Sequence, residues 1–148
     1  MSLKQFDARF IAFARRWYSP ASRVALFVIF FGFGFLKLVG LSPADALAEK
    51  LVGKTVGLTY FHELFILLAL IECIIGILFL IPRATRVVIL LMFIHMLIVC
   101  SPLVLIPDAV WQVPFVPNLE GQYIIKNIAL VALALGLVAH TPPLKAKK

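Results

Sequence analysis

The chain has 148 residues, of which 63% are hydrophobic and 14% are charged, and its formal net charge is +7. An ordinary soluble domain carries about 25% charged residues, and a chain of this size cannot hide so much apolar surface from water. The composition therefore excludes a disordered chain, a disulfide-rich scaffold, a coiled coil and an ordinary water-soluble enzyme. It indicates a single integral membrane domain over residues 1–148.

The first 18 residues predict an amphipathic helix. Four aromatic residues recur at helical spacing, namely Phe6, Phe10, Phe13 and Trp17. Basic residues supply the polar side, so we expect this helix to lie in the membrane interface, with docking on a protein partner as the alternative. Ser19-Pro20 is typical of a helix start and predicts that a separate helix begins there.

Four apolar runs reach the length of about 17–25 residues that a membrane-spanning helix needs. They cover residues 24–41, 61–81, 87–106 and 121–139. Pro82 ends the second run in a tight turn, so spans two and three form an antiparallel hairpin, and Pro102 should kink or end span three. The predicted fold class is an all-α, polytopic four-helix membrane bundle.

Two longer loops, residues 42–60 and 107–120, join spans on the other face of the membrane. Ser42-Pro43 can cap a short outer-face helix between spans one and two. The apolar face of this helix would hold Ala44, Leu47, Ala48 and Leu51. The second loop carries three prolines and predicts a stiff apolar lid at the interface, after which Asn118 can cap span four.

The positive charge is distributed unevenly along the chain. Residues 1–23 contribute +4, the 82–86 turn +2 and the 144–148 tail +3, whereas the rest of the chain contributes −2. Basic residues collect on the cytoplasmic side of membrane proteins. We therefore expect both termini and the 82–86 turn to be cytoplasmic, and we interpret the basic excess as a signal of topology and lipid contact rather than of nucleic-acid binding.

Ionisable residues within spans are costly and therefore informative, at about 2.5–3.5 kcal/mol each. Glu72 lies about 15 Å from the cytoplasmic end of its span, and its side chain is too short to reach water. It must be neutral, paired or beside water; a protonated carboxyl bonded to a neighbouring helix is the structural alternative. Lys37 and Lys126 lie closer to the outer ends of their spans and can also be anchors that reach the headgroups.

Small residues suggest which way these side chains point. Gly34 and Gly76 lie one turn from Lys37 and Glu72, which indicates faces where helices approach closely. Lys126 shares a helix face with one polar neighbour and precedes another, Gln122 and Asn127. The simplest packing places Lys37, Glu72 and Lys126 around one polar chamber. Its net charge of +1 favours a small anion, a carbonyl or a quinone oxygen.

Glu72 is the candidate catalytic group in this interpretation, and Lys37, Gln122, Lys126 and Asn127 are the candidate substrate-binding residues. His95 is a secondary candidate for proton transfer, with a neutral imidazole bonded to a neighbour as its structural alternative. The sequence contains no CxxC, HExxH, P-loop or dinucleotide glycine motif. It therefore encodes no recognisable metal or cofactor site.

Three stretches resemble the DoxX-like family of small bacterial membrane proteins, including its YkgB-like branch. They are Gly-Phe-Leu-Lys at 34–37, Glu-Cys-Ile-Ile-Gly at 72–76 and Gly-Gln-Tyr-Ile-Ile-Lys-Asn at 121–127. The resemblance implies a four-helix protein of the bacterial inner membrane with both ends cytoplasmic. Some members resemble or form small subunits of thiosulfate:quinone oxidoreductase, and others are linked to oxidative stress.

Three functions are compatible with these observations. The first is a redox-linked membrane subunit that binds a quinone or a small anionic substrate, while a protein partner supplies electrons. The second is a proton-coupled transporter or channel, which needs a homo-oligomer because four short helices leave little room for a pore. The third is a structural or assembly protein, in which the polar residues join helices.

Overall fold

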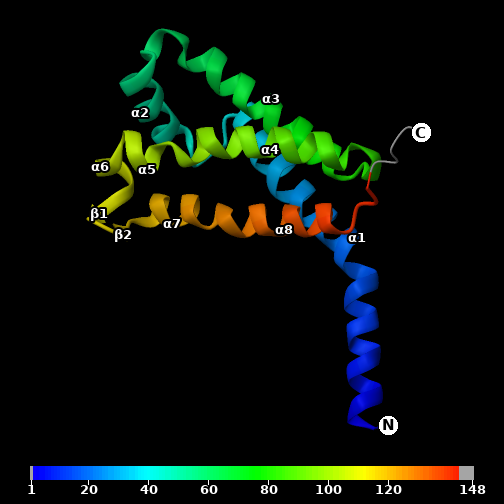
Figure 1. Ribbon diagram of the computed structural model, residues 1–148. Coiled ribbons are helices and arrows are strands. Elements are labelled where there is room, and N and C mark those ends of the chain that lie inside the picture. The colour runs from blue at the N-terminus through cyan, green and yellow to red at the C-terminus, as the bar shows by residue number, and fades with distance from the viewer. Residues whose placement is uncertain (1, 144–148) are drawn as a thin grey trace.

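The structure is a computed structural model that describes residues 2–143 (Figure 1). Within this range four helical stretches are long and apolar enough to cross a membrane. They are Leu3–Leu38, Leu58–Phe79, Pro82–Leu105 and Leu119–Ala139. The predicted all-α architecture with four candidate spans is confirmed, while several helix boundaries differ from the prediction.

Prolines and short turns divide these stretches into individual elements. The helices are α1 (Leu3–Leu38), α2 (Asp45–Thr55), α3 (Phe61–Phe79), α4 (Thr85–Cys100), α5 (Pro102–Leu105), α6 (Pro107–Val110), α7 (Leu119–Ile125) and α8 (Asn127–Ala139). Single 3₁₀ turns at Leu58–Tyr60 and Pro82–Ala84 precede α3 and α4, and two short strands, β1 (Trp111–Val113) and β2 (Val116–Pro117), precede α7. Pro102 ends α4 as predicted, because it cannot donate the next helical hydrogen bond.

The α1–α3 pair forms the most extensive helix contact, and α4 packs on both α3 and α8. Two glycines let α1 and α3 approach. A Cβ atom on Gly34 would lie 2.7 Å from the carbonyl oxygen of Ala69, and one on Gly76 would lie 2.6 Å from the backbone nitrogen of Phe31. A side chain at either position would therefore force the two backbones apart. The predicted close approach at Gly34 and Gly76 is confirmed.

The apolar core occupies the half of the bundle next to the α3–α4 turn. Side chains from α1, α3, α4 and α8 fill it, including Leu26, Phe79, Val88, Met92, Ala134 and Leu137. These side chains are shielded almost completely from solvent. The bundle is thus tightly packed at this end, and its cavity lies in the opposite half.

The predicted helix start at Ser19-Pro20 is not found, because α1 runs without a break from Leu3 to Leu38 with Pro20 inside it. Pro20 removes one backbone hydrogen bond, but the helices on either side continue through it. Ser19 does not cap a helix: its hydroxyl accepts a hydrogen bond from Nε of Arg23 at 3.3 Å. The amphipathic segment is consequently the first part of the same helix that forms span one.

Arg23 of α1 forms hydrogen bonds to both α3 and α4 at the tightly packed end of the bundle. Its Nη1 donates to the carbonyl oxygen of Phe79 at 3.0 Å, and its Nη2 donates to Oγ1 of Thr85 at 2.7 Å. Phe79 is the last residue of α3 and Thr85 the first of α4. One guanidinium therefore holds α1 against the hairpin and satisfies a carbonyl that the end of α3 leaves unpaired.

Replacing Arg23 by methionine should lower the free energy of unfolding by about 1–2 kcal/mol, because these hydrogen bonds are lost and the Phe79 carbonyl loses its partner. Thermal unfolding in mild detergent should show a fall in Tm of about 5 °C. Arg83→Met is the matched control, since Arg83 is an exposed arginine in the α3–α4 turn that Arg23 contacts. An equal fall in both variants would contradict a specific role for Arg23.

The end of the bundle opposite the α3–α4 turn carries α2 and a hairpin. α2 begins at Asp45 without a side-chain cap, and the Ser42 hydroxyl instead accepts a hydrogen bond from the backbone nitrogen of Ala44, so the predicted Ser42 cap is wrong. The hairpin pairs β1 and β2 antiparallel, and the indole of Trp111 donates to the carbonyl oxygen of Leu103. The predicted Asn118 cap of the fourth span is confirmed, because its Oδ1 accepts from the backbone nitrogen of Gly121.

Candidate functional site

The central feature of the site is a buried ion pair between α1 and α3. Nζ of Lys37 lies 2.6 Å from Oε2 of Glu72, and the two side chains are only 9% and 8% exposed. The close contact of the helices at Gly34 brings these residues together, since each lies within a turn of it. The short distance suits an ammonium group that donates to a carboxylate. Lys37 therefore points into the bundle and does not reach for the headgroups.

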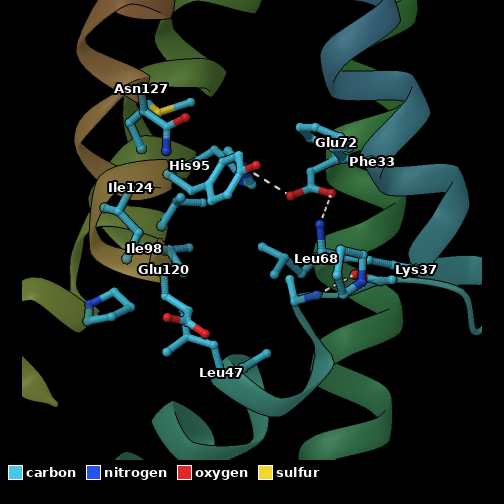
Figure 2. Close-up of a pocket in the computed structure, with 18 of the residues that line it drawn as sticks. Phe33, Lys37, Leu47, Leu68, Glu72, His95, Ile98, Glu120, Ile124 and Asn127 are labelled. Atoms are coloured by element: carbon cyan, nitrogen blue, oxygen red, sulfur yellow. Dashed lines mark hydrogen bonds and ion pairs between the residues drawn. The ribbon is translucent and has the colours of Figure 1, made fainter. Parts of the chain in front are cut away.

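His95 of α4 completes the cluster. Its Nε2 lies 3.4 Å from Oε1 of Glu72, so the carboxyl group faces Lys37 with one oxygen and His95 with the other (Figure 2). The imidazole is 3% exposed, and its Nδ1 is buried without a hydrogen-bond partner among residues 2–143. A proton on Nδ1 would have no acceptor, which is costly for a buried N–H group. The geometry therefore favours the tautomer with its proton on Nε2, the nitrogen that lies 3.4 Å from Oε1 of Glu72.

The cluster forms part of the wall of a cavity with a volume of about 610 Å³. This volume lies within the range of about 300–1,000 Å³ that is usual for small-molecule sites. Most of the lining is apolar, and the lining residues come from seven helices, α1 to α5 with α7 and α8. The apolar ones include Phe30, Phe33, Leu36, Leu47, Ala48, Leu51, Leu68, Met96, Val99, Ile124 and Leu130. The cavity thus combines the Lys37–Glu72–His95 cluster and one further carboxylate, Glu120, with an otherwise largely hydrophobic lining.

Helix α2 covers one side of this cavity. Its residues Leu47, Ala48 and Leu51, together with Ala44 before it, are the apolar face predicted from the sequence, and all four line the cavity. Figure 2 shows Leu47 below the charged cluster, between the two walls of the cavity. The hairpin of β1 and β2 does not contribute lining residues. α2 is therefore the segment that covers the cavity at the end of the bundle opposite the α3–α4 turn.

The wall opposite Lys37 and Glu72 comes from α7 and α8. Asn127 and Glu120 lie on this wall in Figure 2, and Tyr123 also lines the cavity. Asn127 was predicted as a binding residue, whereas Glu120 and Tyr123 were not. These three residues are spaced i, i+3, i+7, which places them on one helix face and could have identified them. The same segment also has a polar face formed by Gln122 and Lys126, and the sequence alone does not choose between the two faces.

The structure does not bring Gln122 or Lys126 to the cavity. Both residues are exposed, and Nζ of Lys126 lies over the Tyr123 ring at 4.0 Å from its centroid. The predicted chamber of Lys37, Glu72 and Lys126 is therefore wrong in its third member, and His95 takes that position. Among the described residues, the lining contains one lysine, Lys37, where two were predicted. The charges of the cavity therefore do not favour an anion.

Comparison of the chain with protein-family models, with curated proteins and with solved structures gives no match. The resemblance to DoxX-like proteins therefore rests on the three sequence motifs. Among residues 2–143, no group of three or more His, Cys, Asp or Glu side chains is arranged to hold a metal ion.

Proposed function

We propose that this protein is a membrane subunit that binds a small, largely apolar molecule with a carbonyl or hydroxyl oxygen. The molecule lies in the cavity beside Lys37, Glu72 and His95, and Glu72 exchanges a proton with it. A quinone is the class of ligand that fits best. The observation that carries the proposal is a buried Lys37–Glu72–His95 cluster at the wall of an apolar cavity of about 610 Å³. The resemblance to DoxX-like proteins is a second, separate support.

The charges of the cluster argue for an uncharged ligand. Lys37 and Glu72 neutralise each other at 2.6 Å, so a small anion gains little by entering and loses its hydration. A carbonyl oxygen can instead accept a hydrogen bond from Lys37 or from Nε2 of His95, whereas a hydroxyl group can donate to Glu72. The apolar lining would hold the ring and its substituents.

Each polar residue has a distinct role in this proposal. Glu72 is the catalytic group that accepts a proton from the ligand hydroxyl or returns it to the oxygen. Lys37 and His95 hold the carboxylate in place and contact the ligand oxygen. Asn127, on the opposite wall, orients the far edge of the ligand. A protein partner supplies or receives the electrons, which makes the chain a redox-linked subunit.

The same proposal includes a location in the bacterial inner membrane with both termini in the cytoplasm. The basic N-terminal part of α1 and the α3–α4 turn lie at one end of the bundle, which supports this orientation through the positive-inside rule. The predicted contribution of the tail, residues 144–148, lies outside the described residues. The alternative orientation would place α2 on the cytoplasmic side.

Binding is better supported than conduction. A transport path within one chain would have to continue from the cluster to the α3–α4 turn. That half of the bundle is filled by side chains that are almost fully shielded, including Leu26, Phe79, Val88 and Met92. The cavity therefore ends at the core, as expected of a binding site.

The test is binding of a short-chain quinone to the purified full-length protein, measured by the ligand-induced rise in Tm and by titration. Glu72→Gln should weaken binding by about 10–100-fold, because a hydrogen bond to a charged group contributes about 1.5–3 kcal/mol. Glu63→Gln is the matched control, since Glu63 is an exposed carboxylate on the same helix. Its affinity should equal that of the parent protein.

A second variant keeps the test informative if Glu72→Gln folds poorly. Ala48→Trp adds an indole to α2 on the side that faces the cavity and leaves the ion pair intact, so it should also reduce affinity. Unchanged binding in both cavity variants would contradict the proposed site. Loss of binding in Lys126→Met alone would instead locate the ligand on the outer surface of α7 and α8.

A further inference from the structure

The first four turns of α1 stand outside the bundle. Every residue from 3 to 17, here called the N-terminal arm, is exposed, and the arm points away from the other helices in Figure 1. At about 1.5 Å per residue the arm is roughly 22 Å long. Because it contributes nothing to the core, its sequence requires another explanation.

The arm has two chemically different faces. Its aromatic face holds large apolar side chains at spacings of three and four residues, each between 50% and 86% exposed: Leu3, Phe6, Phe10, Phe13 and Trp17. Its basic face holds Lys4, Arg9, Arg15 and Arg16. With Asp7 the arm has a net charge of +3. Aromatic and basic faces on one helix are typical of segments that bind an anionic membrane surface.

The base of the arm is held in a defined position. Tyr18 donates from its hydroxyl to the carbonyl oxygen of Leu133 at 3.2 Å, and its ring lies 5.0 Å from the ring of His140. The hydrogen bonds of Arg23 to Phe79 and Thr85 follow one turn later. The arm therefore leaves the bundle at the end that carries the α3–α4 turn.

The direction of the arm matches a membrane surface. In Figure 1 it runs across the direction of α4 and α8. When those helices cross a bilayer, the arm lies along the surface on the side of the α3–α4 turn. Arg83, exposed in that turn, adds positive charge to the same surface. A partner protein would not require this alignment, which is why we favour lipid.

We propose that the N-terminal arm binds anionic lipid headgroups, with its aromatic face inserted at the boundary of headgroups and acyl chains. The binding surface combines Arg15 and Arg16 with Phe10, Phe13 and Trp17. This role is independent of the cavity and of the ligand proposed for it.

Trp17 reports on the proposal directly. The full-length chain is reconstituted in bilayers of phosphatidylcholine alone or mixed with phosphatidylglycerol, with lipids brominated in the acyl chain as quenchers. The difference between the parent and Trp17→Phe isolates the Trp17 signal from that of Trp111. In the anionic bilayers we expect blue-shifted emission and strong quenching of Trp17, and high salt should reduce both.

Charge variants test the anionic preference. Arg15→Gln with Arg16→Gln should lower the ratio of docked to undocked arm in anionic bilayers by roughly 30-fold, from the contribution of two basic residues near an anionic surface. Lys50→Gln with Lys54→Gln, which removes two exposed charges from α2, should leave the ratio unchanged. Equal quenching in both lipid mixtures, or Trp17 emission typical of water that changes only when a soluble protein is added, would overturn the proposal.

Discussion

Lys37→Met should lower the free energy of unfolding by about 3–5 kcal/mol, because it leaves the buried Glu72 carboxylate without its ammonium partner. Both side chains are less than one-tenth exposed, so bulk water can replace little of the lost interaction. His95 contacts only the other carboxylate oxygen, at 3.4 Å, and cannot compensate fully. Thermal unfolding in mild detergent should show a fall in Tm of about 10 °C.

The double variant Lys37→Met with Glu72→Leu separates the charge effect from packing. Replacing a buried ion pair by apolar side chains of similar volume is often neutral or stabilising, so the double variant should recover most of the loss. Lys126→Met, which removes an exposed lysine, should change stability by no more than about 0.5 kcal/mol. A double variant as unstable as Lys37→Met would contradict a buried ion pair as the cause.

Gly34→Ala and Gly76→Ala should each lower the free energy of unfolding by about 1–3 kcal/mol, the usual cost of overpacking. The new methyl group would meet backbone atoms, which cannot rotate away as a side chain can. At Gly34 it would lie 2.7 Å from the oxygen of Ala69 and 2.9 Å from the nitrogen of Cys73, and at Gly76 2.6 Å from the nitrogen of Phe31. Separation of α1 from α3 would also lengthen the Lys37–Glu72 contact.

Gly32 is the matched control on the same helix. A Cβ atom on Gly32 would meet no atom of the described part of the chain within 4 Å, so alanine there should stabilise the helix by about 0.5–1 kcal/mol. Two substitutions of the same kind, two residues apart in α1, should thus have opposite signs in thermal unfolding. A similar Tm for Gly34→Ala and Gly32→Ala would mean that α1 and α3 do not approach at Gly34.

Local patterns in the sequence were sufficient for much of the fold. Apolar run length located the four spans, Pro102 located the end of α4, and Asn118 located the start of α7. The cost of an ionisable group at membrane depth singled out Glu72, because a carboxyl on a short side chain has few ways to be satisfied there. The same local reasoning failed at Ser19-Pro20, where packing and the flanking helix carry α1 through the proline.

The composition and the order of residues by themselves determined a membrane bundle with a buried carboxyl near its middle, since both follow from the cost of leaving polar groups in an apolar solvent. Only the tertiary structure decided which groups meet that carboxyl. Lys126 and Asn127 differ by one position, about 100° around a helix, and packing turns Asn127 inward and Lys126 outward. Likewise, His95 reaches Glu72 and α2 covers the cavity through contacts between distant segments, which no local spacing specifies.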